Sequence, residues 1–214
     1  MVFSRGFPTT AVAVLVTGLV VIVAVIILPS AFHFLSTGPV NGMEQARGLV
    51  EKYLSGLNPD LRVKEIMEFS QNYYVRVQEE STGINAFELL VDRSTGQVSP
   101  EPGPNMMWNT KYGMMTRRGM MMMGSGMMIG RGTNYPISAR MSVSVQDASK
   151  YAQKWLDPNF RGAEMEEAYS FYGYYTIDFS HNGQTIGMLS VNGYTGDVWY
   201  HTWHGEFIRM VEYE

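Results

Sequence analysis

The segment from Asn105 to Arg131 holds ten of the chain's seventeen methionines. Thioether sulfur is a soft ligand that suits Cu(I), and paired methionines on a flexible loop are able to place three sulfurs around one ion. The segment is therefore a candidate soft-metal site. Its residues are Met106, Met107, Met114, Met115, Met120, Met121, Met122, Met123, Met127 and Met128.

The charge of this segment opposes cation binding. It contains Lys111, Arg117, Arg118 and Arg131 but no acidic residue, so a bound ion would meet repulsion. The alternative interpretation is a glycine-rich linker whose methionines form an adaptable apolar surface that packs on a partner or a membrane. We expect no cofactor, with Cu(I) as the alternative.

The aromatic run that begins at Trp199, WYHTWHGEF, is the second candidate. If it stays extended, His201 and His204 face opposite ways and do not easily share a metal, and a turn would change that conclusion. The run is interpreted either as an aromatic strand that closes a core or as a docking surface for a protein. The predicted partner-binding residues are Trp199, Tyr200, Trp203 and His204.

Catalytic motifs are absent from the sequence. There is no G-x-S-x-G elbow, H-E-x-x-H helix, phosphate-binding glycine loop or haem attachment sequence, and with no cysteine there is no thiol chemistry. The acidic group at Glu164, Glu166 and Glu167 is typical of a solvated face. The net charge of −4 argues against nucleic acid as a partner. We therefore expect a protein that is not an enzyme.

An internal duplication supplies the elements that position these residues. At an offset of 102, the apolar positions of residues 43–54 fall on apolar positions of residues 145–156, and residues 63–77 match residues 165–179. After a connection two residues shorter, VDRSTGQV at 91–98 lies over VNGYTGDV at 191–198. The chain therefore carries two copies of one module.

The apolar spacing predicts the structure of that module. Apolar residues recur at steps of three and four in the first segment of each copy, which predicts a helix, with Asn41 and Ser144 as the N-caps. The period then becomes two, which predicts strands with one buried face. Turns are expected at residues 81–83, 95–96, 181–183 and 195–196. We predict an α+β fold in which each copy packs one helix on an antiparallel β-sheet.

The sequence resembles the PepSY domains of peptidase propeptides and of bacterial and archaeal envelope proteins. The resemblance lies in the helix that carries Glu44-Gln45-Ala46, or Gln146-Asp147-Ala148, in the Tyr-Tyr strand, and in the closing motif at 91–98. The second copy departs from it by Asn192 in place of the aspartate. The resemblance covers residues 42–101 and 144–204, and it implies a non-catalytic module that binds or restrains another protein, often a peptidase.

An uncharged apolar stretch at residues 11–28 predicts a membrane anchor. With its neighbours it reaches the roughly 20 residues that cross a bilayer, so we expect a transmembrane helix at about 10–29 that contacts lipid. A cleaved signal peptide is the alternative, although its apolar region would usually be about 7 to 15 residues. Arg5 precedes the stretch, which places the N-terminus in the cytoplasm and the rest outside.

These observations divide the chain into four parts. Residues 1–40 form the anchor and a spacer, residues 41–104 the first PepSY-like repeat, residues 105–140 the Met/Gly-rich linker, and residues 141–214 the second repeat with an aromatic C-terminal tail. We expect a single-pass protein of the cell membrane that binds an envelope protein through its outer modules. The partner would be a peptidase or a subunit of a larger membrane complex.

Overall fold

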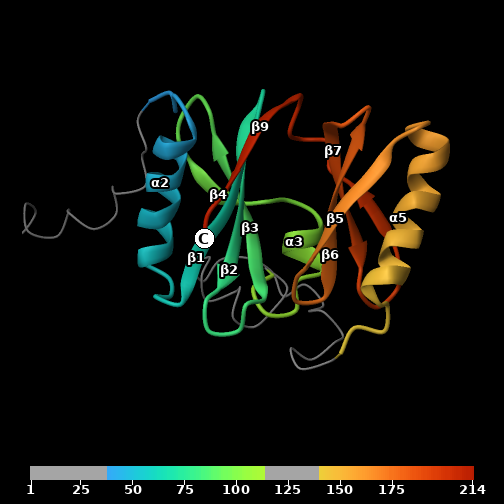
Figure 1. Cartoon of the computed structure of the whole chain (residues 1–214). Coiled ribbons are helices and arrows are strands. Elements are labelled where there is room, and N and C mark those ends of the chain that lie inside the picture. The colour runs from blue at the N-terminus through green and yellow to red at the C-terminus, as the bar shows by residue number, and fades with distance from the viewer. Residues whose placement is uncertain (1–37, 114–139) are drawn as a thin grey trace, which may run out of the picture. The chain divides into compact units, whose positions relative to one another are not determined.

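The computed structural model describes residues 38–113 and 140–214, which form an α+β fold with two antiparallel sheets (Figure 1). The predicted fold class is confirmed at that level. No helix within these two ranges has the length and apolar character needed to cross a bilayer. The predicted anchor at about 10–29 lies outside the described residues.

Each predicted module contributes a helix and a run of strands. In the first part of the chain these are α2 (Met43–Ser55), β1 (Leu61–Phe69), β2 (Asn72–Glu79), β3 (Asn85–Asp92), β4 (Val98–Pro100) and the short α3 (Pro104–Met107). In the second part they are α5 (Val145–Asn159), β5 (Glu164–Ser170), β6 (Tyr174–His181), β7 (Gln184–Asn192), β8 (Val198–Tyr200) and β9 (Phe207–Glu212).

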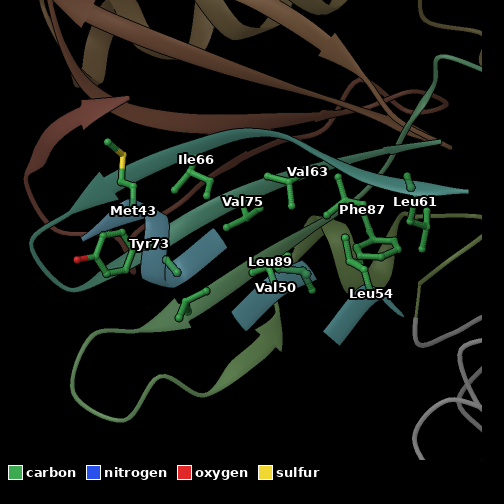
Figure 2. Packing of buried hydrophobic residues seen from close by; sticks show 14 of the residues in the cluster. Met43, Val50, Leu54, Leu61, Val63, Ile66, Tyr73, Val75, Phe87 and Leu89 are labelled. Carbon is green, nitrogen blue, oxygen red and sulfur yellow. The ribbon is translucent and has the colours of Figure 1, made fainter. Parts of the chain in front are cut away.

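The apolar stripe of each helix packs on one sheet. Helix α2 buries Met43, Ala46, Val50 and Leu54 at helical spacing against the first sheet, as Figure 2 shows for the side chains around Ile66. Helix α5 buries its equivalent stripe against β6 and β7 of the second sheet. Burial of these stripes holds each helix in place, because helices of this length are marginal alone.

The equivalent tyrosines of the two modules make the same bond. The Tyr73 hydroxyl donates to the Val40 carbonyl at 3.2 Å, and the Tyr175 hydroxyl donates to the Val143 carbonyl at 2.8 Å. Each bond ties a central strand to the backbone that precedes its helix. The equivalence extends to the hairpins, where Gly83 and Gly183 both take the positive φ that a tight turn requires.

One of the two predicted N-cap residues is confirmed, and the other is wrong. Ser144 caps α5 by accepting the Asp147 amide, as expected. Asn41 does not cap α2, because Gly42 occupies the N-cap and makes no side-chain bond. The amide of Asn41 instead donates to the Gln45 side chain at 2.9 Å.

The C-terminal strand leaves the second sheet and joins the first. The sheet orders are β4-β3-β2-β1-β9 and β5-β6-β7-β8, so β9 pairs antiparallel with β1. The second module therefore supplies an edge strand to the sheet of the first module (Figure 1).

The prediction of one buried face per strand is wrong, because both faces of the central strands are buried. The faces turned away from the helices meet one another, and Tyr174 donates to Glu88 across this interface at 2.8 Å. Beside a small apolar cluster, the buried layer between the sheets holds many polar residues: Glu65, Arg76, Glu88, Glu101, Thr176, Asp178, Ser190, His201 and His204. We call this set the polar interlayer.

Candidate functional site

The aromatic run near the C-terminus turns instead of staying extended. Strand β8 ends at Tyr200, and both His201 and His204 are 3% exposed. The segment is held by the turn between β1 and β2, where the Gln71 amide donates to the His204 carbonyl and the Ser70 amide to the Glu206 carbonyl. The expectation that the two histidines point apart therefore does not hold, because the extended backbone on which it depended ends before them.

Glu101 reaches the same place from the first module. It directly follows β4, and its amide donates to the Glu88 carbonyl of β3 at 3.0 Å. The side chain is fully buried in the polar interlayer. Its carboxylate therefore meets the two histidines where the sheets face one another.

Three side chains converge at this point, and we call them the Glu-His-His cluster: Glu101, His201 and His204. Glu101 Oε1 lies 3.0 Å from His204 Nε2 and 3.3 Å from His201 Nδ1. One ligand atom from each residue lies within 4.8 Å of the other two. A carboxylate oxygen and two imidazole nitrogens form a donor set that binds transition-metal ions.

The close contacts of the cluster are not hydrogen bonds. His201 Nδ1, His204 Nε2 and Glu101 Oε2 are buried and have no hydrogen-bond partner among the described residues. Leaving a buried polar atom unpaired costs about 1–3 kcal/mol each. The carboxylate does accept one bond, from the Trp203 indole Nε1–H to Oε1 at 3.0 Å.

The hydrogen bond of His204 Nδ1, the ring nitrogen that does not contact Glu101, fixes the tautomer of His204. His204 Nδ1 lies 3.0 Å from the Asn72 Oδ1 acceptor, and the Asn72 amide nitrogen donates to the Trp203 carbonyl at 2.8 Å. Since the amide oxygen has no proton to give, His204 Nδ1 carries the hydrogen. A neutral His204 therefore has its lone pair on Nε2, the nitrogen that lies 3.0 Å from Glu101 Oε1.

The outer nitrogen of His201 is oriented by a chain of hydroxyls. Thr176 donates to Glu88 Oε1 at 2.6 Å, and the Ser190 hydroxyl lies 3.1 Å from the Thr176 hydroxyl. With the Thr176 proton used, Ser190 donates to Thr176 and accepts from His201 Nε2–H at 3.0 Å. His201 then has its lone pair on Nδ1, the nitrogen that lies 3.3 Å from Glu101 Oε1.

Burial and charge act in opposite directions on the ionisable groups of the cluster. Burial by itself raises the pKa of Glu101, but the charge of a protonated His201, and then hydrogen bonding to the two histidines, outweigh burial and hold that pKa well below its usual range. Burial lowers the pKa of His204, and Glu101 offsets only part of this effect. At neutral pH His204 is therefore a neutral imidazole, the form in which histidine binds metal.

Glu88 lies beside the cluster in a ring of hydroxyls. Its carboxyl oxygens accept from Tyr74 at 2.9 Å, from Tyr174 at 2.8 Å and from Thr176. Burial, and then the charge of Glu101, raise the pKa of Glu88 well above its usual range. The bonds to Thr176 and Tyr174 oppose this rise without reversing it, so the pKa values of Glu88 and Glu101 are shifted in opposite directions.

The residues predicted from the aromatic run take different positions. Tyr200 packs in the second core and stacks on Trp155, and His204 belongs to the cluster. Trp203 is half-buried and stacks on His201 with ring centroids 4.8 Å apart. Trp199 is 37% exposed and meets Trp108 edge to face, with ring centroids 6.0 Å apart.

Two of the ten methionines of the predicted soft-metal site lie in the described part of the chain. Met106 is half-buried, and Met107 is 47% exposed at the end of α3. The rest, Met114, Met115, Met120 to Met123, Met127 and Met128, lie outside the described residues. The soft-metal site therefore stays a prediction.

Glu101 and Asn72 were missed by reasoning from the sequence. Neither lies in a motif, and Glu101 is separated from the histidines by about half of the described chain. One indication is present in the duplication, because the offset that matches 91–98 to 191–198 also places Glu101 on His201.

Comparison with known proteins gives little further guidance. No protein-family model and no curated protein matches the chain. Among solved structures, the fold is similar to the Bacillus megaterium YpeB C-terminal domain, with a TM-score of 0.28 and 12% sequence identity over 78% of this chain. The match spans 65% of that domain's chain.

Proposed function

We propose that this chain is a membrane-anchored, extracytoplasmic and non-catalytic binding or regulatory protein built from two PepSY-like modules. The uncharged stretch at residues 11–28 and Arg5 before it support the anchor and its orientation. The duplicated helix and meander support the two modules. Residues 141–214 form the second module, and its last strand completes the sheet of the first.

An exposed apolar surface at the junction of the two modules carries this proposal. Met107 ends α3, Trp108 directly follows it, and Trp199 lies in β8; we call these three residues the junction patch. Met107 and Trp199 are exposed, and Trp108 is half-buried. Trp108 contacts Trp199, so the patch exists only when the modules are packed together. Tryptophan is enriched among the residues that dominate protein interfaces, and methionine adapts to irregular partners.

The location of the ionisable groups supports a non-catalytic role. The carboxyl groups with strongly raised pKa, Glu88 and Asp178, are fully enclosed between the sheets. A substrate would have to separate the sheets to reach them. These groups are therefore placed to hold the modules together and not to act on a bound molecule.

The partner we propose is another protein of the envelope, a peptidase or a subunit of a membrane complex, that buries Trp199 and Met107. A photo-crosslinking amino acid at position 199 of the full chain, in its own membrane, should give one adduct of discrete mass. The same amino acid at Ile84, which is 38% exposed in the β2–β3 turn, is the matched control. Equal adducts at both positions, or none at position 199, would contradict the proposal.

Cu(I) binding by the methionine segment is the second candidate, favoured by the density of thioethers in residues 105–131. It requires that Cu(I) affinity, measured against a competing chelator, collapses when the ten methionines are replaced by leucine. An affinity that the leucine variant leaves unchanged would eliminate it.

A further inference from the structure

The distances from Glu101 to the two histidines in the Glu-His-His cluster are close to those between ligands of one metal ion. Zinc binds nitrogen and oxygen ligands at about 2.0–2.2 Å, so two ligands of a tetrahedral ion are about 3.4 Å apart. Glu101 Oε1 lies 3.0 Å from His204 Nε2 and 3.3 Å from His201 Nδ1. The two histidine nitrogens lie within 4.8 Å of one another, so binding of one ion by all three residues would draw these nitrogens closer together.

The hydrogen bonds around the cluster leave a lone pair on one nitrogen of each histidine, Nε2 of His204 and Nδ1 of His201. Asn72 holds the proton of His204 on Nδ1, and Ser190 accepts the proton of His201 from Nε2. Each imidazole that binds a metal normally donates its other N–H to a fixed acceptor in this way. The cluster therefore places two nitrogen lone pairs and one carboxylate in the same buried space.

We propose that Glu101, His201 and His204 bind one divalent transition-metal ion, and that Zn²⁺ is the ion the site suits. Two imidazoles and one carboxylate match the ligand types of protein zinc sites. Since the set contains no thiolate or thioether, it does not favour Cu(I). The three residues lie outside the methionine segment in the sequence, and the site goes beyond the binding function proposed above.

The ion would link the two modules. Glu101 follows β4 of the first module, whereas both histidines follow β8 of the second. The histidine segment also leads into β9, which pairs with β1. Bound Zn²⁺ therefore fixes the segment that connects the sheets, and it stabilises the packed arrangement on which the junction patch depends.

A protonated histidine is the rival explanation for the short contacts. If His204 were an imidazolium, Nε2–H would point at Glu101, but these atoms lack hydrogen-bond geometry. This rival predicts that the contacts between Glu101 and the histidines strengthen as the pH falls. The metal site predicts that the cluster weakens as the pH falls, because protons compete with the ion for imidazole.

The test is Zn²⁺ binding to the full chain, purified in mild detergent and stripped with a chelator. Equilibrium dialysis followed by elemental analysis should give one Zn²⁺ per chain at neutral pH and none at a pH that protonates histidine. The variants Glu101→Gln, His201→Gln and His204→Gln should each lose this ion. The control His181→Gln, which alters an exposed histidine outside the cluster, should keep it. Zn²⁺ binding that is absent from the wild type, or that survives all three cluster variants, would overturn the proposal.

Two further measurements test the metal site even if a cluster variant fails to fold. Asn72→Ala leaves all three ligands in place and should weaken Zn²⁺ by about 10–100-fold through loss of the outer bond. Nitrogen NMR of the histidines in the wild-type chain should show metal-induced shifts at His201 Nδ1 and His204 Nε2 and not at His181. Shifts at neither residue would overturn the proposal without any substitution.

Discussion

Glu101 and His201 occupy equivalent positions in the two repeats, and their side chains contact one another, with Oε1 and Nδ1 3.3 Å apart. Each directly follows the short fourth strand of its module. The Glu101 amide donates to Glu88 of β3, and the His201 amide donates to Met188 of β7, both at 3.0 Å. The packing of two copies through the same face therefore brings equivalent residues together, and a carboxylate at both positions would be repulsive.

The pairing of unlike residues at this position can be tested by exchange. His201→Glu should destabilise the protein by about 3–5 kcal/mol, because it buries a second carboxylate without a partner. Glu101→His should also destabilise it, by removing the anion. The double exchange restores one carboxylate and one imidazole, so urea unfolding should reveal a favourable coupling between the two changes of about 0.5–3 kcal/mol. If the loss of unfolding free energy in the double variant equals the sum of the losses in the two single variants, Glu101 and His201 do not interact directly.

The buried His204 should make stability depend on pH near neutrality. Burial lowers its pKa in the folded state, whereas the unfolded residue titrates near 6.5. The unfolded chain therefore takes up a proton that the folded chain refuses, and stability is lost as the pH falls through about 6.5, by up to about 1.4 kcal/mol per pH unit. Urea unfolding with chelator present should show this slope.

The control separates His204 from the other histidines. His204→Gln should flatten the slope between about pH 7 and pH 5, and His181→Gln, which replaces an exposed histidine outside the cluster, is the matched control. An equal slope in His204→Gln and in the wild type would show that His204 is not the residue responsible.

A second charged cluster joins the modules through Glu79. Its carboxylate contacts Lys111 and Tyr112 and accepts from the Tyr172 hydroxyl of the second module at 2.6 Å. Burial raises the pKa of Glu79, but these bonds outweigh it and bring the pKa to about 2. Since this pKa is lowered, the stabilisation is complete above the unfolded pKa near 4.5 and is lost as the pH falls toward 2.

Replacement of this carboxylate should show the same pH window. Glu79→Gln should lower the free energy of unfolding by about 3 kcal/mol at pH 7, because Lys111 loses its buried partner. Lys111 is partly exposed, which keeps the loss at the lower end of the range for buried pairs. The difference from the wild type should shrink below about pH 4.5, where the wild-type carboxylate also takes up a proton. Chemical unfolding at pH 7 and pH 3 measures both values, and a difference that is independent of pH would contradict the ion pair.

Local patterns in the sequence predicted much of each module. The helical stripe that ends at Leu54, the Ser144 cap and the turn at Asn182 and Gly183 depend on residues close in sequence, and the structure confirms them. Such features are decided by backbone conformation and by burial of one face. They do not depend on how the modules pack.

The polar interlayer was not predictable in the same way. Arg76 and Asp178 look like outward residues of half-buried strands, yet both are buried where the sheets meet. Arg76 pairs with Glu65 and lies over the Tyr169 ring of the second module at 3.8 Å. Alternation of apolar and polar residues predicts that one face of each strand is exposed to solvent. That face is buried only because two modules that are distant in the sequence pack against one another.

The docking of β9 on the first sheet gives a prediction that compares adjacent residues. Phe207 is half-buried and meets Phe69 of β1 edge to face, with ring centroids 5.7 Å apart, whereas Ile208 is 51% exposed. Phe207→Ala should therefore lower the free energy of unfolding by about 1.5–3 kcal/mol, while Ile208→Ala should change it by less than about 0.5 kcal/mol. Urea unfolding of the two variants measures the difference. Because neighbouring side chains of a strand point to opposite faces, a larger loss for Ile208→Ala would mean that β9 pairs with β1 in another register.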